Sequence, residues 1–393
     1  MKIALILNST PAVSETFLIS KIRGLQKNGH EVTIFARHKK DFKLCKVIIL
    51  SNINRIFLIQ IIKMVFTFFT LFFSAPLGAR KFLKLEKTDK VPIRKRLENL
   101  YLNSKIIKND FDWIHFPFMT LTIRRENVAK SINAKMSVSF RGYDIFVYPL
   151  RNPKCYESAW PKIDKVHSIS ECLLKKAEQY GLDRNNKQYI IRPAVDTSLF
   201  SKKIENSEFW EFSDRVKFLT IARLHWIKGL EYVLEALAYL EPVKFMYTII
   251  GEGVEYERLK LAIDQLNLND SVKIIRHVPH DKINLFYQET DIYIQYSLEE
   301  GFCNAVLEAQ AMGTLTIVSD ALGLQENVKD QKTGWVVPKR DPFSLNKKIK
   351  EILLMEEKHL SKIRENSIYR VNKNFNLTKQ EQKFHRFFNE NIF

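Results

Sequence analysis

The chain has 393 residues, of which 46% are hydrophobic and 27% charged, and its formal net charge is +18. These values exclude a disordered chain and provide enough apolar sequence for two domains of ordinary size. The four cysteines lack the paired spacing of a metal site, so we expect free thiols in a reducing cytoplasm.

The amino-terminal part of the chain alternates predicted strands and helices. Residues 2–7 form an apolar run that is too short for a secretory signal and is typical of a buried strand. A helix is expected from about Ser14 to Gly29, followed by a strand at residues 31–36. Further strands are expected at residues 112–116 and 136–140. This alternation predicts an α/β fold with parallel, Rossmann-like sheets.

Positive charge is concentrated between residues 37 and 108, where 17 Lys and Arg stand against 4 Asp and Glu. This interval favours an anionic partner surface, either a membrane or a nucleic acid. We expect no nucleic acid partner, because the basic run contains no recognisable nucleic-acid-binding motif. A peripheral contact with an anionic membrane is the interpretation that we prefer.

Residues 56–73 of this interval form a nearly continuous apolar run, in which Gln60, Lys63, Thr67 and Thr70 make one narrow polar stripe along a helix. Three interpretations stay open. The helix spans a membrane, since 18 residues reach about 27 Å, although the Lys within the run argues against this. Alternatively, it fills the core with its stripe exposed, or it lies against a membrane surface.

The second half of the chain opens with a strand at residues 216–221, after the polar stretch 201–215. Arg223 and Lys228 follow this strand, and Gly229 precedes the next predicted helix. Because the free N–H groups at a helix start attract phosphate, both cations are placed to meet a diphosphate at this turn.

The most informative segment runs from Glu300 to Glu308 and follows a predicted strand at residues 291–296. A Gly-containing turn leads into a helix that we expect to have Asn304 as its N-cap and to end at Gly313. The N–H groups of the helix start favour a phosphate, and the two carboxylates can bind hydroxyls of groups attached to that phosphate. The segment therefore predicts a site for a sugar nucleotide.

These motifs resemble glycosyltransferase family 4, the retaining enzymes of GT-B fold. The resemblance lies in Glu300-Gly301-Phe302 with Glu308, and in Arg223 with Lys228-Gly229. Ser14-Glu15-Thr16-Phe17 also resembles family members that build bacterial exopolysaccharides, including those of the colanic acid type. The resemblance implies two Rossmann-like domains with parallel sheets that face each other across a cleft.

The resemblance also implies a division of the chain. We expect an acceptor-binding domain over residues 1–200 and a nucleotide-sugar-binding domain over residues 201–375. A C-terminal helix within residues 376–393 is expected to pack back on the first domain.

Roles for single residues follow from the same resemblance. Arg223 and Lys228 are expected to stabilise the charge of the leaving diphosphate, Glu300 to hold the donor sugar, and Glu308 to hold the ribose hydroxyls. Further donor contacts are expected at Gly301, Phe302, Cys303, Asn304 and Val278.

Arg141 and Asp144 complete the expected catalytic set. They stand where family members commonly have His-Gly-x-Asp, so the arginine replaces the family's histidine. A guanidinium at this position suits a phosphate or another anion, because its planar donors match such groups.

The expected reaction is a retaining transfer of a hexosyl group from a nucleoside diphosphate sugar to a glycan or lipid-linked acceptor in cell-surface polysaccharide synthesis. No metal and no cofactor are expected, because Arg223 and Lys228 would carry the leaving-group charge. The alternatives are a GT-B epimerase or phosphorylase and a non-catalytic membrane scaffold. We expect a cytoplasmic protein. A peripheral position at the inner face of the membrane is the alternative location.

Overall fold

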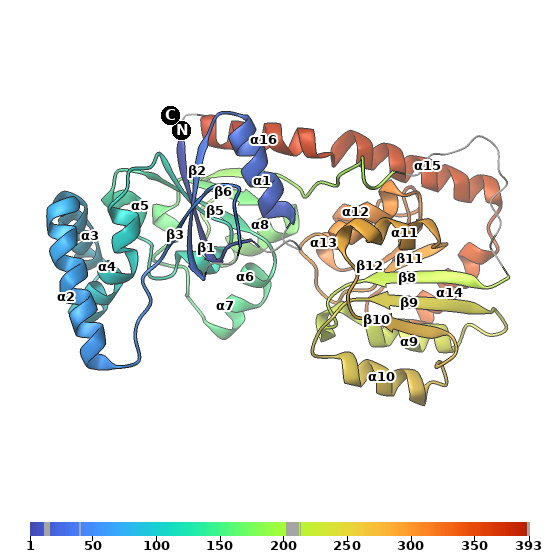
Figure 1. Cartoon of the computed structure of the whole chain (residues 1–393). Coiled ribbons are helices and arrows are strands. Elements are labelled where there is room, and N and C mark those ends of the chain that lie inside the picture. The colour runs from blue at the N-terminus through green and yellow to red at the C-terminus, as the bar shows by residue number, and fades with distance from the viewer. Residues whose placement is uncertain (12–15, 39–40, 202–211, 213, 391–393) are drawn as a thin grey trace. The chain divides into compact units, whose positions relative to one another are not determined.

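The computed structural model describes residues 1–11, 16–38, 41–201, 212 and 214–390. The chain divides into two compact units, Met1–Ile191 with the segment from Glu381, and Arg192–Gln380. Each unit is built on one parallel sheet, of seven strands in the first and six in the second (Figure 1). The predicted α/β class with two Rossmann-like sheets is therefore confirmed. The division falls after Ile191, whereas the sequence analysis placed its boundary after residue 200.

The sheet of the first unit has the strand order β3-β2-β1-β4-β5-β6-β7. Its strands are β1 (Lys2–Ser9), β2 (Glu31–His38), β3 (Lys46–Ile49), β4 (Trp113–Phe116), β5 (Lys135–Phe140), β6 (Lys165–Ser168) and β7 (Lys187–Ile190). Its helices are α1 (Thr16–Lys27), α2 (Phe57–Ser74), α3 (Pro76–Thr88), α4 (Ile93–Ile107), α5 (Val128–Ser131), α6 (Tyr143–Phe146), α7 (Tyr148–Arg151) and α8 (Glu171–Glu178), with short 3₁₀ turns η1 (Met119–Thr122) and η2 (Trp160–Lys162).

The core of the first unit forms where the apolar run of β1 pairs with β2 and β4. Ile3 and Leu5 of β1 are fully buried, and Leu18 and Ile22 of α1 pack against the same cluster. Residues 14–15 of the exopolysaccharide-type motif, where the first helix was expected to begin, lie outside the described residues.

The helix α2 lies almost entirely outside this core. It is long and apolar enough to cross a membrane by length and composition, yet only 11% of its residues are buried. The interpretation of this segment as a core helix is therefore wrong, because too little of its apolar surface is covered by the rest of the first unit.

The sheet of the second unit has the order β10-β9-β8-β11-β12-β13. Its strands are β8 (Val216–Ile221), β9 (Phe245–Ile250), β10 (Val272–Ile275), β11 (Ile292–Gln295), β12 (Leu315–Ser319) and β13 (Trp335–Val337). Its helices are α9 (Leu230–Ala238), α10 (Tyr256–Gln265), α11 (Ile283–Gln288), α12 (Asn304–Ala311), α13 (Leu322–Asn327), α14 (Pro342–Leu353) and α15 (Glu357–Asn374), with 3₁₀ turns η3 (Trp226–Lys228) and η4 (His280–Lys282). Figure 1 shows α9 and α10 on one face of this sheet and α11 and α12 on the other.

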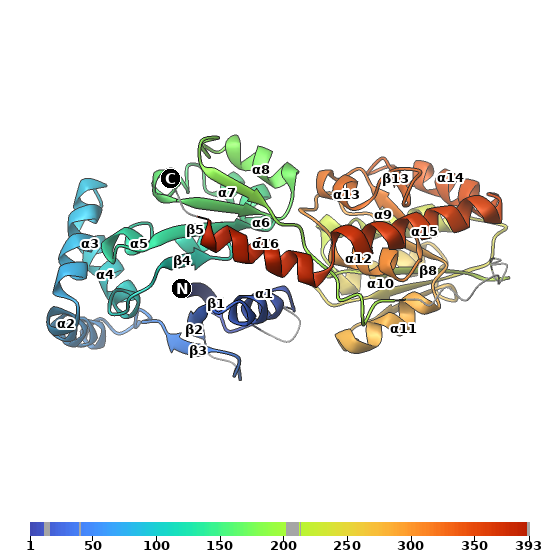
Figure 2. The same ribbon diagram turned by 90° about the horizontal axis from the view of Figure 1, so that it is seen from above.

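The last helix, α16 (Leu377–Asn389), begins in the second unit and continues into the first (Figure 2). Its aromatic residues Phe384, Phe387 and Phe388 are buried in the same cluster as β1 and α1. The ammonium of Lys165 on β6 donates hydrogen bonds to the carbonyls of Phe387 and Glu390, at 2.6 Å each. The second half of α16 is thus part of the core of the first unit.

Candidate functional site

The candidate site lies in the second unit, at the carboxyl ends of the neighbouring strands β8 and β11. The strand order reverses its direction of progression between these two strands. In open α/β sheets, ligands bind beyond the carboxyl ends of the strands at such a reversal. The loop after β8 carries Arg223 and Lys228, and the loop after β11 carries Glu300.

Backbone contacts hold Lys228 against the loop after β11. The N–H of Leu298 donates to the carbonyl of Ile227 at 2.7 Å. Gly229 has a left-handed conformation with φ of 59°, and a Cβ added there would stand 2.4 Å from the carbonyl oxygen of Tyr296. A glycine is needed after Lys228 because any side chain would push the two loops apart.

Lys228 and Glu300 form an ion pair, with the ammonium nitrogen 2.5 Å from a carboxylate oxygen. Ser297 donates a second hydrogen bond to the same oxygen, at 3.1 Å. Burial is the largest single effect on the pKa of Lys228 and lowers it, whereas the charge of Glu300 and its hydrogen bond raise it, and the net shift is upward. The charge of the exposed Arg223 acts in the opposite direction and lowers the pKa of Lys228.

The loop from Glu300 to Cys303 is fixed from α13. The N–H of Gly323 donates to the carbonyl of Glu300 at 3.1 Å, and a Cβ on Gly323 would stand 2.4 Å from the carbonyl oxygen of Gly301. The side-chain amide of Asn327 bonds both the N–H and the carbonyl of Cys303, at 2.9 Å each. The position of Glu300 is therefore set by backbone packing.

Cys303, and not Asn304 as predicted, is the N-cap of α12. Asn304 is the first helical residue, because Asn327 already bonds the backbone of Cys303 in an extended conformation. Burial raises the pKa of the Cys303 thiol to about 12, so this side chain remains protonated at neutral pH. The helix ends before Gly313, whose φ of 71° is the left-handed conformation expected there.

Phe302 is buried, and the centroid of its ring lies 5.8 Å from the ring centroid of Phe375. Its side chain is therefore part of the packing beneath the loop, which leaves only its backbone for the predicted donor contact. Val278 lies between β10 and η4 and is half-buried.

Glu308 lies one helical turn into α12, where its side chain is nearly buried. One carboxylate oxygen lies 3.2 Å from Nε2 of His280, and the other accepts a hydrogen bond from the hydroxyl of Tyr287 at 3.1 Å. The hydrogen bond with Glu308 raises the pKa of His280, against the effect of burial. Glu308 is thus oriented by two side chains that approach from η4 and α11.

Arg141 and Asp144 belong to the first unit, in the segment that follows β5. The Asp144 carboxylate is buried and accepts hydrogen bonds from the backbone N–H groups of Met119, Arg141 and Gly142. Burial raises the pKa of Asp144, while these three donors act to lower it. The guanidinium of Arg141 lies 3.5 Å from the ring centroid of Phe17. The Asp144 side chain therefore fixes the turn that carries Arg141.

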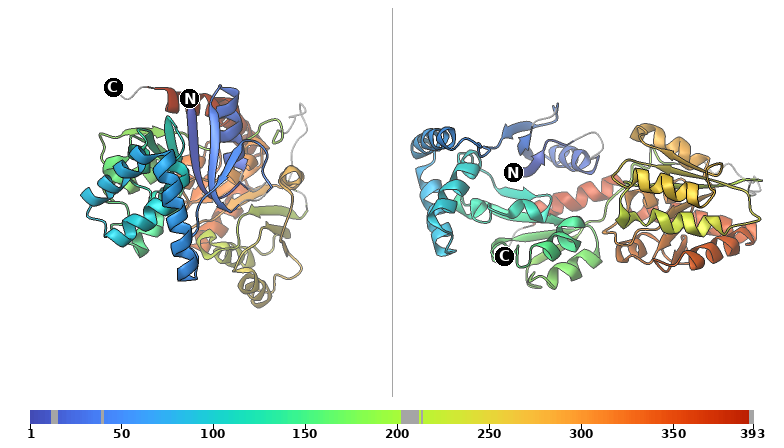
Figure 3. Two further views of the ribbon diagram at one scale, coloured as in Figure 1. Left: turned by 60° about the vertical axis from the view of Figure 1, so that its left-hand side comes forward. Right: turned by 90° about the horizontal axis from the view of Figure 1, so that it is seen from below.

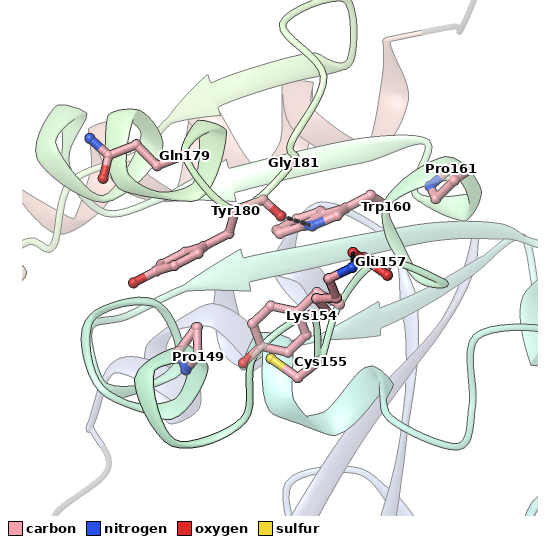
Figure 4. A pocket seen from close by; sticks show the side chains of 10 residues that line it. Pro149, Lys154, Cys155, Glu157, Trp160, Pro161, Gln179, Tyr180 and Gly181 are labelled. Carbon is pink, nitrogen blue, oxygen red and sulfur yellow. Dashed lines mark hydrogen bonds and ion pairs between the residues drawn. The ribbon is translucent and has the colours of Figure 1, made fainter.

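A cavity of about 460 Å³ lies elsewhere in the first unit, between the segment after α7 and the end of α8 (Figure 4). Tyr156, Trp160 and Tyr180 are among its lining residues, and the Trp160 indole N–H donates to the carbonyl of Tyr180 at 2.7 Å. None of the predicted site residues lines it. Within the described ranges, no three His, Cys, Asp or Glu side chains gather as a metal-binding group.

Several residues that shape the site were not predicted from the sequence. His280 and Tyr287 orient Glu308, Ser297 orients Glu300, and Asn327 fixes Cys303. Only Ser297 lies close to its partner in sequence. The others come from elements that approach α12 in the folded unit, so no local spacing signals them.

The chain is similar in sequence to known glycosyltransferases. A family model described as "Glycosyl transferases group 1" matches residues 202–370. The chain is 27% identical over 253 residues to the amylovoran biosynthesis glycosyltransferase AmsK of Erwinia amylovora, covering 62% of this chain and 61% of that protein. It is 25% identical over 273 residues to the colanic acid biosynthesis glycosyltransferase WcaL of Escherichia coli, covering 67% and 66%. The matches thus span slightly less than two thirds of these relatives.

Solved structures resemble the chain over nearly its full length. Sucrose-phosphate synthase of Thermosynechococcus elongatus has a TM-score of 0.73 at 17% identity, covering 99% of this chain and 98% of its own. HepE of Anabaena, solved in complex with UDP, also has a TM-score of 0.73, at 15% identity and with 98% and 99% coverage. At these identities the likeness establishes the shared GT-B fold.

Proposed function

We propose that this chain, whose residues 202–370 match the model of the group 1 glycosyltransferases, transfers a sugar from a nucleoside diphosphate sugar to a hydroxyl of an acceptor. The acceptor is a glycan or a lipid-linked sugar in the synthesis of a cell-surface polysaccharide. The names of AmsK and WcaL, which refer to amylovoran and colanic acid biosynthesis, support this assignment.

The observation that carries the proposal is the Lys228–Glu300 ion pair at the carboxyl ends of β8 and β11. An ammonium at this place matches a diphosphate, and a carboxylate beside it matches the hydroxyls of a sugar. The solved complexes of HepE with UDP and with UDP-glucose support a nucleotide sugar as the donor.

Glu308 holds the ribose of the donor in this proposal. Its carboxylate lies on the same loop and helix segment as Glu300, eight residues further along, and His280 and Tyr287 fix its orientation. An ionised carboxylate can accept hydrogen bonds from two adjacent hydroxyls. Backbone groups near Val278 would contact the base.

The proposed transfer retains the configuration of the sugar. The bond between the anomeric carbon and the diphosphate oxygen breaks, and the acceptor oxygen bonds to the same face of that carbon. The acceptor proton passes to the leaving phosphate. Arg223 and Lys228 stabilise the negative charge that develops on the diphosphate, so the proposed reaction does not require a metal. Arg141 binds an anionic group of a substrate beside Asp144, which holds the turn of Arg141 in place.

The proposal places the protein in the cytoplasm, in peripheral contact with an anionic membrane through the basic segment of residues 37–108. Such a position would give the enzyme access to an acceptor that is attached to a lipid.

A panel of nucleoside diphosphate sugars, scored by thermal unfolding, tests the proposal. A ligand that binds only the native state stabilises it by about 2.7 kcal/mol at a concentration 100-fold above its Kd. We expect at least one nucleotide sugar to raise the Tm, while the free sugars leave it unchanged. If no nucleotide sugar raises the Tm, the proposal is wrong. Interconversion of the bound sugar without any acceptor would point to the epimerase alternative.

A further inference from the structure

The helix α2 is oriented with its polar side inward. Gln60 and Leu71 are its buried residues, and Thr67 and Thr70 are half-buried beside them. The side chain of Gln60 accepts a hydrogen bond from the N–H of Asn54 at 2.7 Å, and the ammonium of Lys108 donates to the hydroxyl of Thr70 at 2.7 Å. Most of the polar stripe that the sequence analysis identified thus faces the first unit.

The opposite side of α2 is apolar and exposed. The relative exposure of its outward residues lies between 59% and 72%, and we call this set the apolar face: Phe57, Leu58, Ile62, Val65, Phe66, Phe69, Phe72 and Phe73. Since an aromatic side chain alone carries about 150–250 Å², this surface exceeds the patch of about 300–600 Å² that is usual for a monomer. A surface of this kind requires a partner.

The charges around the apolar face identify the partner. Residues 57–108 contain 11 Lys and Arg but only 3 Asp and Glu. All three acids have partners within the first unit: Asn99 and Asn127 donate to Glu86, while Asp89 pairs with Lys162 and Glu98 with Arg124. Arg94 also pairs with Glu98, at 3.4 Å. By contrast, many of the other cations are exposed, namely Lys63, Arg80, Lys84, Lys87, Lys90 and Lys95. An apolar face beside unneutralised cations matches lipid tails beneath anionic headgroups.

The packing of α2 also decides how it meets the bilayer. The helix contacts both α3 and α4, and the three helices lie together at one margin of the first unit (Figures 2 and 3). A helix that crossed the membrane would draw α3 and α4, with their exposed cations, into the hydrocarbon. Charged side chains are rarely placed there, because their transfer from water is unfavourable. In a bilayer, the helix can therefore bury its apolar face only by lying parallel to the surface.

We propose that α2 is a monotopic anchor that lies in the plane of an anionic bilayer, with its apolar face in the acyl boundary and the cations of α3 and α4 at the headgroups. This inference deepens the proposed membrane contact by naming the element that enters the lipid. Vesicle binding is measured without nucleotide or acceptor, so its failure can be distinguished from failure of the proposed sugar transfer.

Flotation of the full chain with vesicles tests the anchor. The vesicles contain phosphatidylcholine alone or with about one third phosphatidylglycerol, since anionic lipid attracts the cations. The variant Leu58→Gln/Ile62→Gln/Phe66→Gln changes only exposed side chains, so its folding is expected to be unaffected. It should bind both kinds of vesicle at least about tenfold less than the wild type. A control variant changes three exposed leucines of the second unit, Leu261, Leu285 and Leu354, to Gln and should bind normally.

The role of charge is tested separately. The variant Lys84→Gln/Lys87→Gln/Lys95→Gln should lose at least about tenfold of its binding to the anionic vesicles, and about 0.5 M salt should have a similar effect on the wild type. Replacement of the exposed Lys175, Lys332 and Lys358 by Gln serves as the control. If the Lys84/Lys87/Lys95 variant binds anionic vesicles as well as the wild type does, the proposed headgroup contact is overturned.

Three outcomes would overturn the anchor itself. The first is vesicle binding that survives the triple change in α2. The second is a wild-type dimer that the same change converts to monomers while vesicles are not bound, which would assign the apolar face to a second copy of the chain. The third is retention of the bound protein during extraction with alkaline carbonate, which would indicate a spanning helix. Release by carbonate is the expected result.

Discussion

The ammonium of Lys228 lies 2.5 Å from the carboxylate of Glu300, although 72 residues separate the two in the chain. Parallel pairing of β8 with β11 brings the two loops together, and the close approach at Gly229 keeps them in contact. The Lys228–Glu300 ion pair thus depends on the sheet topology and on Gly229, whose lack of a side chain allows the two loops to touch.

Replacement of Lys228 by Ala should slow sugar transfer by about 100-fold or more, if the ammonium stabilises the leaving diphosphate as strongly as an oxyanion donor does. The measurement is the initial rate at saturating donor. Lys260→Ala, which removes an exposed cation from α10, should retain the wild-type rate. Equal rates in the two variants would remove the proposed role of Lys228.

Replacement of Glu308 by Ala should weaken binding of the nucleoside diphosphate by about tenfold to a hundredfold, because hydrogen bonds to a charged group contribute about 1.5–3 kcal/mol. Calorimetric titration measures this change. Tyr287→Phe removes one contact of the carboxylate but leaves its charge, so its effect should be smaller. An unchanged Kd in the Glu308 variant would mean that the ribose binds elsewhere.

The contact between His280 and Glu308 predicts a pH dependence of stability. The hydrogen bond to Glu308 raises the pKa of His280 above its unfolded value, which is about 6.5. The contribution of the pair to the free energy of unfolding is therefore full below about pH 6.5 and is lost as the pH rises through the folded pKa. Urea unfolding of wild type and His280→Asn should differ most at the acidic end of the range from about pH 5.5 to 8.5. A difference that grows with pH would contradict this sign.

The last prediction concerns the contribution of the C-terminal helix α16 to stability. Phe387 is fully buried in the core of the first unit, so Phe387→Ala should lower the free energy of unfolding by about 3–5 kcal/mol. Phe57→Ala changes an exposed residue of the same type in the same unit and should alter it by less than about 0.5 kcal/mol. If the two variants unfold alike, α16 does not stabilise the first unit as described.

Much of the fold and part of the site could be predicted from sequence. Alternating strand and helix patterns imply parallel sheets, and the family resemblance assigned Lys228 and Glu300 to one nucleotide-sugar donor. The partners of Glu308 could not be predicted, because His280 and Tyr287 come from other elements, 28 and 21 residues earlier in the chain. The N-cap shifted by one residue for a similar reason, since Asn327 lies on a separate helix.

The orientation of α2 could not be predicted either. A narrow polar stripe on an apolar helix has the same sequence pattern whether the stripe faces water or faces the protein. The burial of Gln60 and the hydrogen bond from Lys108 to Thr70 show that most of the stripe faces inward. The same pattern is therefore consistent with a core helix and with a membrane-facing helix until its neighbours are known.

A crystal structure of the chain with a nucleoside diphosphate sugar bound would test the central claim most directly. We predict that the diphosphate lies within hydrogen-bond distance of the Lys228 ammonium and that the ribose hydroxyls contact the Glu308 carboxylate. A ligand bound away from the carboxyl ends of β8 and β11, with Lys228 and Glu308 untouched, would contradict it.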